Sequence, residues 1–433
     1  MRALTVLCKV VDNFGDIGFV YRLSKNLCKV NPDCDIRIIT NDVGTFLKLA
    51  PELGGKTEPD SKTKNEAANE NCSQAQEGPA ATKTDDKTKK GPARIRLFDS
   101  NASDLCRAEF AANPPRVILE CFQCGRPDWL EEILFGGETG NGGKTETAGA
   151  SGDCSQDQKV AAALIINIDY LTAESYAEEF HKLKSGTRSA SVKKYFFMPG
   201  FTAKTGGLIL DAPETETDGK TKTAGPQILM FSYPKNFAPI IRAIMRWNPN
   251  AQINLAQGAG KESFLQAAAR FGQPKNYGKT TTTGGLKICE LPFFSQQDWD
   301  KNLYASDLLF VRGEDSLTRA CLSAKPFVWQ AYLQDDNYQL VKVRALLDRM
   351  RPHFDPADFA ALQNFWLLYN DTDLAGSCDY EQKMEAACHE FLTRYNSLRA
   401  GFESFARSLR DLGNFTQKLL DFVAEMESSL RKV

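Results

Sequence analysis

Short apolar runs alternate with amphipathic stretches along most of the chain. The largely apolar runs at 4–11 and 35–40 flank residues 19–30, where apolar side chains recur every three or four residues and share one helical face. Strand–helix alternation of this kind favours parallel sheets covered by helices on both faces. By the same criteria we expect strands at 117–122, 163–168, 228–231, 252–256, 287–291, 308–311 and 326–329, and helices at 239–247 and 262–271.

The alternation occurs in two series, which a polar region near 203–226 separates. We therefore expect an α/β fold of two doubly wound, Rossmann-like domains that face a cleft, at 1–205 and 225–400. Residues 401–433 differ, because phenylalanines and leucines recur there at three- and four-residue spacing. This pattern predicts an amphipathic helix, with Gly413 as a candidate break, that packs across the molecule and returns to the N-terminal domain.

Low-complexity segments interrupt the first series. Residues 54–94 contain no Val, Ile, Leu, Met, Phe, Trp or Tyr, and 136–159 is similar, with shorter versions at 215–226 and 273–285. We interpret all four as insertions into surface loops, which cost little closure entropy. Their Gly-Lys-Thr strings lack the upstream glycine and the preceding strand of a phosphate-binding loop, which excludes a Walker-type NTPase.

Composition excludes several classes of partner. The chain has 433 residues, and its 53 Lys and Arg nearly balance its 55 Asp and Glu, so no strong field recruits nucleic acid or anionic lipid. No apolar run is long enough for a membrane span, and the N-terminus is typical of a first strand rather than a signal peptide. We therefore expect a cytoplasmic protein with no membrane or nucleic-acid partner.

Histidine and cysteine limit the metal chemistry that the chain can carry. Three histidines are too few for a His-rich metal site. Twelve cysteines include one C-x-x-C pair, Cys121 and Cys124, without a second pair at zinc-ribbon spacing. Reduced thiols at the end of a strand are the interpretation we favour, with zinc binding or redox use of the pair as the alternative.

The first loop after a strand is acidic. In doubly wound folds ligands bind beyond the carboxyl ends of the strands, where Asp12-Asn13-Phe14-Gly15-Asp16 stands here. Two carboxylates would repel a pyrophosphate but could converge on one cation or proton donor. The alternative is that one of them caps the following helix.

A second loop predicts an anion site. The strand at 308–311 ends in Arg312-Gly313-Glu314-Asp315-Ser316, and a helix follows. Free N–H groups at the helix start, together with Arg312, suit a diphosphate, and Glu314 could accept hydrogen bonds from sugar hydroxyls. A surface cap with a salt bridge is the alternative.

Aromatic and amide side chains follow other strands. In the loop Leu291-Pro292-Phe293-Phe294-Ser295 one phenylalanine could stack on a base, although core burial of both is the alternative. We favour Phe293 over Phe294 as the stacking ring. Four further residues stand at strand ends, with core burial as the alternative for the last: Ser232, Tyr233, Gln257 and Gln330.

Three motifs together resemble a known family. Val-Val-Asp-Asn-Phe-Gly-Asp-Ile-Gly at 10–18, Arg-Gly-Glu-Asp-Ser at 312–316 and Lys-Pro-Phe-Val-Trp-Gln at 325–330, in this order, closely resemble the bacterial elongation-factor-P arginine rhamnosyltransferases. The resemblance covers essentially the whole chain apart from the insertions. It implies a GT-B fold and transfer of L-rhamnose from dTDP-β-L-rhamnose to the guanidino group of one arginine of elongation factor P. That modification lets the factor rescue ribosomes stalled on polyproline.

The resemblance also implies an inverting reaction without a metal or other cofactor, by a protein that we expect to be a monomer. It makes Asp12, Asp16 and Glu314 the catalytic acids. The first two belong to the acceptor side, and the loop 312–316 to the donor side. We expect the donor to contact Asn13, Phe14, Gly15, Ser232, Tyr233, Gln257, Leu291, Phe293, Arg312, Gly313, Glu314, Asp315, Ser316 and Gln330.

The residues themselves agree with this chemistry. A guanidinium forms bidentate pairs with carboxylates, so an acidic pair is a plausible arginine clamp. We favour Asp16 as the base or guanidinium holder and Asp12 as its orienting partner, and the sequence leaves the choice open. Asp335-Asp336 is an acidic doublet near these motifs, which we interpret as a solvated helix cap rather than a metal site. Two alternatives remain: another GT-B nucleotide-sugar enzyme, and a non-catalytic protein that binds elongation factor P.

Overall fold

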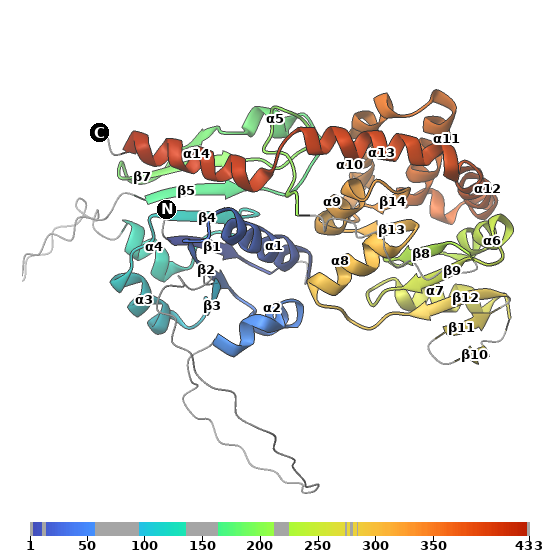
Figure 1. The fold of residues 1–433 in the computed structure, drawn as a ribbon, viewed down its shortest axis with the longest axis horizontal. Helices are drawn as coiled ribbons and strands as arrows, with labels where there is room; N and C mark the ends of the chain where they lie inside the picture. Colours follow the sequence, from blue (N-terminus) through green and yellow to red (C-terminus); the bar gives the residue numbers. More distant parts are fainter. Residues whose placement is uncertain are drawn as a thin grey trace, which may run out of the picture.

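The computed structural model describes residues 3–10, 14–56, 95–135, 163–211, 225–272, 275–277, 280–283 and 285–430. Two α/β units lie side by side, each built on its own sheet, and the C-terminal helices run along both (Figure 1). Most of the insertions expected at 54–94 and 136–159 lie outside the described residues. Among the described residues, none of the helices combines the length and apolar character needed to cross a membrane.

The N-terminal sheet has the strand order β3-β2-β1-β4-β5-β7-β6. All its pairings are parallel except that of the short β6 with β7. The central strands are almost wholly buried, as expected where helices cover both faces of a parallel sheet. The strands are β1 (Ala3–Cys8), β2 (Asp35–Thr40), β3 (Ile95–Asp99), β4 (Val117–Cys121), β5 (Ala163–Ile168), β6 (Lys184–Ser185) and β7 (Val192–Phe197).

Helices connect these strands and cover the sheet. The longest, α1, leads directly away from β1 and presents a buried apolar face to the core. The chain then passes through residues 198–211 towards the second unit. The elements are α1 (Phe14–Val30), α2 (Val43–Leu49), the 3₁₀ helix η1 (Pro51–Lys56), α3 (Ser103–Ala112), α4 (Asp128–Phe135) and α5 (Tyr176–Phe180).

The C-terminal sheet has the order β10-β11-β12-β9-β8-β13-β14, with five parallel strands and an antiparallel edge. We expected a low-complexity loop at 273–285, and the edge strands β10 and β11 show that this was wrong for part of it. A hairpin on an edge is held by backbone pairing, and threonine suits a strand, so no apolar run is needed. The strands are β8 (Gln227–Met230), β9 (Gln252–Leu255), β10 (Lys275–Tyr277), β11 (Thr280–Thr283), β12 (Leu286–Glu290), β13 (Leu308–Arg312) and β14 (Phe327–Gln330).

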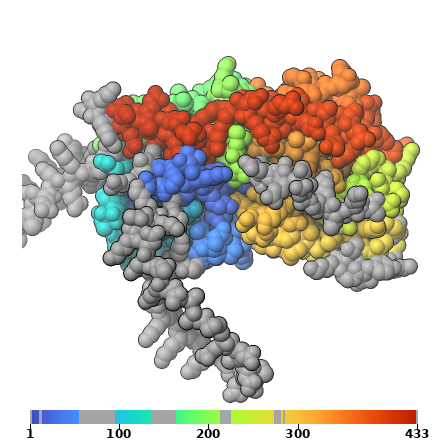
Figure 2. Space-filling model, in the orientation of Figure 1, coloured from blue at the N-terminus to red at the C-terminus, as the bar shows by residue number. Residues whose placement is uncertain are grey.

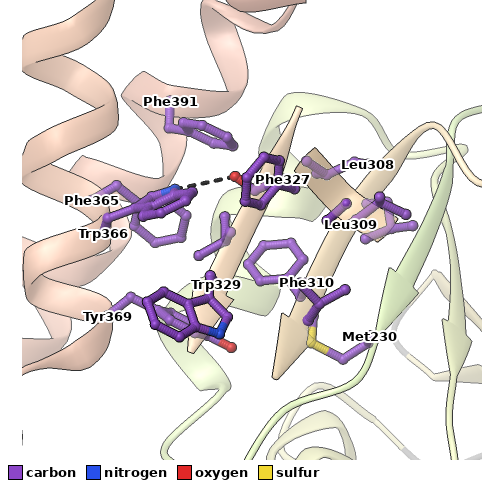
Figure 3. Close-up of a cluster of buried hydrophobic side chains, with 14 of the residues drawn as sticks. Met230, Leu308, Leu309, Phe310, Phe327, Trp329, Phe365, Trp366, Tyr369 and Phe391 are labelled. Atoms are coloured by element: carbon purple, nitrogen blue, oxygen red, sulfur yellow. Dashed lines mark hydrogen bonds between the residues drawn. The ribbon is translucent and has the colours of Figure 1, made fainter. Parts of the chain in front are cut away.

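A cluster of aromatic side chains anchors β13 and β14, whose ends carry two of the predicted motifs. Phe310 and Phe327 pack against rings of α11, and Trp366 donates a hydrogen bond from Nε1 to the carbonyl of Phe327 at 3.1 Å (Figure 3). The helices of this unit are α6 (Ala238–Trp247), α7 (Lys261–Ala269), α8 (Gln296–Ala305), α9 (Glu314–Leu322), α10 (Gln339–Met350), α11 (Pro356–Asn370) and α12 (Tyr380–Thr393), with 3₁₀ turns η3 (Asp335–Asn337), η4 (Arg351–His353) and η5 (Leu374–Gly376).

The amphipathic C-terminal segment forms two helices, α13 (Tyr395–Asp411) and α14 (Phe415–Leu430), which lie end to end across both units (Figures 1 and 2). They separate at Gly413, whose φ of +84° favours glycine. The apolar face of α13 belongs to the C-terminal core and that of α14 to the N-terminal core. Of these two helices, α14 is therefore the one that returns to the first unit. The domain boundaries expected at 1–205, 225–400 and 401–433 stay predictions.

Candidate active site

A cleft of about 370 Å³ lies between the two units. Phe14, Gly15 and Gly18, in the first turns of α1, line its N-terminal side. The C-terminal side is lined by the ends of β8, β9 and β13, by the loop after β12, and by the starts of α8 and α9. Six of the residues predicted to contact the donor line its C-terminal wall or its floor: Gln257, Phe293, Arg312, Gly313, Asp315 and Ser316.

Arg312 brings positive charge to the end of β13. Its guanidinium lies between the rings of Phe231 and Tyr233, at 4.5 and 4.6 Å from their centroids, which favours a cation by cation–π attraction. Its buried Nε has no hydrogen-bond partner among the described residues. An anion that enters the cleft could supply one.

The next residues turn the chain into α9. Gly313 has a φ of +71°, which is open to glycine and strained for other residues, and it precedes the first turn of the helix. The first N–H groups of a helix lack intrahelical partners and carry the positive end of its dipole. Ser316, 8% exposed, lines the cleft within this turn. Arg312 and this helix start therefore form a site with the chemistry of an anion receptor.

The loop after β12 places one phenylalanine in the open. Phe293 is 47% exposed, and its ring centroid lies 4.7 Å from that of Phe14 in α1. Phe294 is half-buried and packs on the C-terminal core, although it also lines the cleft. Gln257 donates from Nε2 to the carbonyl of Leu291 at 2.7 Å, which ties the end of β9 to this loop. Phe293 is thus the more accessible stacking surface.

Asp16 lies in the first turn of α1, within the helix rather than at its N-cap, and is buried. Tyr170, which follows β5, donates its hydroxyl to Asp16 Oδ1 at 3.2 Å. The Tyr170 ring stacks on Phe122 at 4.2 Å, and Phe122 has the left-handed φ of 59° that is uncommon outside glycine. Asp12 and Asn13 lie outside the described residues, so the convergence of two carboxylates stays a prediction.

Comparison with known proteins identifies the family. The family model described as "Elongation-Factor P (EF-P) rhamnosyltransferase EarP" matches residues 4–424. The chain belongs to this family.

Curated and solved EarP relatives agree with this. A protein-arginine rhamnosyltransferase of Neisseria meningitidis (serogroup B, strain H44/76) is 26% identical over 97% of this chain and 96% of its own length, and one of Shewanella oneidensis is 28% identical over 83% and 84%. A solved structure described as the structural basis for EarP-mediated arginine glycosylation of translation elongation factor EF-P matches with a TM-score of 0.54 and 16% identity. It covers 98% of this chain and 99% of its own.

Three predictions are thereby confirmed: the family, the two-sheet GT-B architecture, and an enzyme of the protein-arginine rhamnosyltransferase class. Membership of the EarP family argues against the alternative of a non-catalytic protein that binds elongation factor P. The solved relative supports the fold alone, because its sequence identity is low.

Several EarP residues that we predicted at the donor do not line the cleft. Ser232 is buried, with its Oγ 2.7 Å from the hydroxyl of Tyr369. Gln330 is also buried, and its Oε1 accepts a hydrogen bond from the backbone N–H of Tyr233 at 2.9 Å, so it holds the loop that carries the Tyr233 ring. Leu291 contributes its carbonyl to Gln257. Their contacts to a bound donor stay predictions.

The two acidic residues of the α9 start behave differently. Glu314 is the first residue of α9, half-buried beside the cleft but not among its lining residues, and its backbone carbonyl accepts from Thr318 Oγ1 at 2.9 Å. Asp315 lines the cleft, yet both its carboxylate oxygens accept hydrogen bonds from Arg22 of α1, at 2.7 and 2.9 Å. Arg22 and Tyr170 were not expected from the sequence, because each contacts a residue that is distant in the chain.

The described residues contain no cluster of three or more His, Cys, Asp or Glu that could hold a metal ion. Asp335 and Asp336 are exposed in η3, but neither side chain caps a helix, and the N-cap of α10 falls on Tyr338. The helix-cap prediction was therefore wrong in its detail. Cys121 and Cys124 are free thiols, and burial raises the pKa of Cys124 to about 11, so it is protonated at neutral pH.

Proposed function

We propose that this EarP-family enzyme transfers L-rhamnose from dTDP-β-L-rhamnose to the guanidino group of one arginine of elongation factor P. The observation that carries the proposal is one cleft with two kinds of wall. Its C-terminal wall presents Arg312 and the start of α9, and its N-terminal wall is the start of α1, the helix that carries Asp16. The names of the family and of its relatives support both the sugar and the acceptor.

The C-terminal wall suits a nucleoside diphosphate. Arg312 and the N–H groups of the first turn of α9 would bind the diphosphate and stabilise the negative charge that develops on it as a leaving group. Phe293 would stack on the thymine, with Gln257 at the edge of the same wall. Glu314, at the helix start, would accept hydrogen bonds from rhamnose hydroxyls.

The N-terminal wall suits a cationic acceptor. Asp16, with Asp12 as its partner, would pair with the guanidinium and orient one nitrogen towards C1 of rhamnose. In the transfer step that nitrogen forms a bond to C1, the bond from C1 to the diphosphate oxygen breaks, and the carboxylate takes the proton that the nitrogen loses. Attack opposite the leaving group inverts the anomeric centre.

The proposal includes a metal-independent reaction by a monomer in the cytoplasm, where elongation factor P works on ribosomes. Arg312 and the α9 start supply the charge that a divalent cation would otherwise bring to the diphosphate. A different GT-B activity, such as transfer to a glycan or sugar epimerisation, would need the donor wall but not a carboxylate that faces a cation.

Incubation with dTDP-β-L-rhamnose and elongation factor P tests the proposal. We expect the intact mass of the factor to rise by one deoxyhexose, and peptide fragmentation to place the sugar on an arginine. A factor whose target arginine is replaced by lysine is the matched control and should stay unmodified. Release of dTDP without a change in the mass of the factor would point to another acceptor, and an unchanged donor would overturn the proposal.

A further inference from the structure

A buried arginine joins the two units below the cleft. Arg22 lies on α1, the helix that carries Asp16, and its side chain is 1% exposed. A guanidinium has five N–H donors, and all of them are used here at 2.7–2.9 Å. Two donors bind Asp315, two bind Asp300 and one binds Asp211. Two bidentate pairs on one guanidinium fix its position and its plane.

The three carboxylates come from three separate segments. Asp315 belongs to α9, Asp300 to α8, and Asp211 to the connection between the units. A second buried arginine, Arg319 of α9, also binds Asp211 and donates to the carbonyl of Ile209 at 2.7 Å. Burial alone would lower the pKa of Arg22, but the carboxylates of Asp315 and Asp300 hold that pKa well above its ordinary value, so Arg22 keeps its positive charge.

This network reaches the floor of the cleft. Gly18 and Asp315 both line it, and a Cβ on Gly18 would lie 3.5 Å from Oδ2 of Asp315, so α1 and α9 approach closely there. Gln296 of α8 donates from Nε2 to the carbonyl of Gly18 at 2.6 Å. The start of α9, which faces the cleft with Ser316, is therefore fastened to the helix that holds Asp16.

We propose that Arg22 is a positioning residue that locks the start of α9 to α1, and thereby sets the separation between the sugar donor and the acceptor nitrogen. The inference rests on the function proposed above for Asp16 and the α9 start. The carboxylate of Asp315 acts through Arg22 rather than on the donor, while the N–H groups of this turn remain available to the diphosphate. Bond formation requires reacting atoms about 3–3.5 Å apart, and a misplacement of about 1 Å can cost on the order of 100-fold in rate.

Two substitutions test the lock. Arg22→Lys keeps the charge but cannot form two bidentate pairs, and Asp315→Asn keeps the shape but removes the ionic pair. We expect each to lower kcat at saturating donor and acceptor by roughly 10- to 100-fold, with dTDP affinity, measured by calorimetry, changed by less than about threefold. The exposed pair Arg107 and Glu132 supplies matched controls, Arg107→Lys and Glu132→Gln, which should leave both quantities unchanged.

The double variant, Arg22→Lys with Asp315→Asn, distinguishes the lock from a direct contact between Asp315 and the donor. If Asp315 acts through Arg22, the double variant should lose no more kcat than the worse single variant. Independent losses that multiply, or a large fall in dTDP affinity with Asp315→Asn alone, would overturn the inference. Solution scattering gives a readout that needs no turnover: Arg22→Lys should have a larger radius of gyration than the parent, and an equal radius would also count against the lock.

A third substitution keeps the inference testable if the Arg22→Lys protein fails to fold. Asp300→Asn removes the other bidentate partner of Arg22 but leaves the pair with α9 in place. Its kcat should fall several-fold less than that of Asp315→Asn, even where both proteins melt at the same temperature. Equal losses would show general weakening and overturn the inference. A parent enzyme that cannot modify elongation factor P, but expands in solution with Arg22→Lys, would refute the proposed function and leave the lock standing.

Discussion

Two arginines near the start of α9 show how differently one side chain can be used. Every N–H of the Arg22 guanidinium donates to a carboxylate, so this side chain has a structural role. Arg312 has a buried Nε without a hydrogen-bond partner among the described residues, and its guanidinium lies close to the rings of Phe231 and Tyr233. Since buried polar groups are normally satisfied, an anion in the cleft is a suitable partner for this donor.

Asp16 is the residue at which the proposed chemistry is most directly tested. Asp16→Ala should reduce transfer to elongation factor P by at least about 100-fold, because a positioned base contributes roughly that much to a rate. Donor binding should persist, since Asp16 does not line the donor wall. Asp104→Ala, which alters an exposed carboxylate in the first turn of α3, is the control. Near-normal turnover of the Asp16 variant would reduce this residue to a structural role, and Asp12→Ala is interpreted in the same way.

The exposed ring of Phe293 gives a second test at this scale. A stacked base is worth roughly 1–3 kcal/mol, so Phe293→Ala should weaken dTDP binding about tenfold or more in calorimetry. Phe293→Trp should retain most of the affinity because it keeps a flat aromatic face. Phe180, 41% exposed on α5 and absent from the cleft lining, provides the control Phe180→Ala. An unchanged affinity for Phe293→Ala would place the thymine elsewhere.

At the scale of elements, the junction of β13 and α9 supplies the positive side of the cleft. The aromatic cluster between β14, β13 and α11 holds the strand in place, and Gly313 allows the tight turn that aims the helix start at the cleft (Figure 3). The anion site is thus a property of two rigid elements rather than of a loop.

Arg312→Met should weaken dTDP binding by roughly 10- to 100-fold, because a hydrogen bond to a charged group contributes about 1.5–3 kcal/mol. Methionine keeps an apolar stem beside the rings of Phe231 and Tyr233 and removes the charge together with the N–H donors. Thymidine, which lacks the diphosphate, should bind the variant and the parent equally in competition experiments. Arg246→Met, on the last turn of α6, controls for the loss of one exposed positive charge. Equal dTDP affinity would move the diphosphate away from β13.

Which elements the sequence could predict follows from how they are buried. The strand expected at 163–168 coincides with β5, because a buried parallel strand appears as a continuous apolar run. Helix α11 has no clear amphipathic period, because much of it is buried, so periodicity could not predict it, although Asp355 and Pro356 mark its start. The hairpin of β10 and β11 depends on backbone pairing at a sheet edge, which leaves no apolar pattern.

At the scale of the whole molecule, the two units are tied where the chain crosses between them. The connection after β7 and the break before α14 run side by side, with the N–H of Phe415 donating to the carbonyl of Leu208 at 2.9 Å. Asp211 of the same connection enters the ionic network of Arg22. These contacts bring α1 and α9 together at one cleft.

Long-range pairing also explains what the sequence could not show. Strand ends and glycine turns pointed to Arg312, Ser316 and Phe293, because their chemistry is visible in the residues beside them. Arg22 lies 293 positions from Asp315, and its neighbours in the chain resemble those of any helix. An ionic partner in another unit leaves no local pattern, so the sequence could not show that the carboxylate of Asp315 pairs with Arg22. Its contact with a bound donor stays a prediction.

The distribution of charge over the whole cleft leads to the last prediction, which concerns metal ions. A hard divalent cation on a diphosphate needs several oxygen ligands in a fixed arrangement. At the donor wall Arg312 and the α9 start supply positive charge, while the carboxylate of Asp315 is already paired with Arg22. A cation placed beside Arg312 would be repelled.

We therefore expect transfer to elongation factor P to proceed at an unchanged rate in excess EDTA, measured by intact mass over time. A magnesium-dependent glycosyltransferase in the same buffer is the control for chelation. Loss of turnover that magnesium or manganese restores would show that a cation, not Arg312, neutralises the leaving diphosphate.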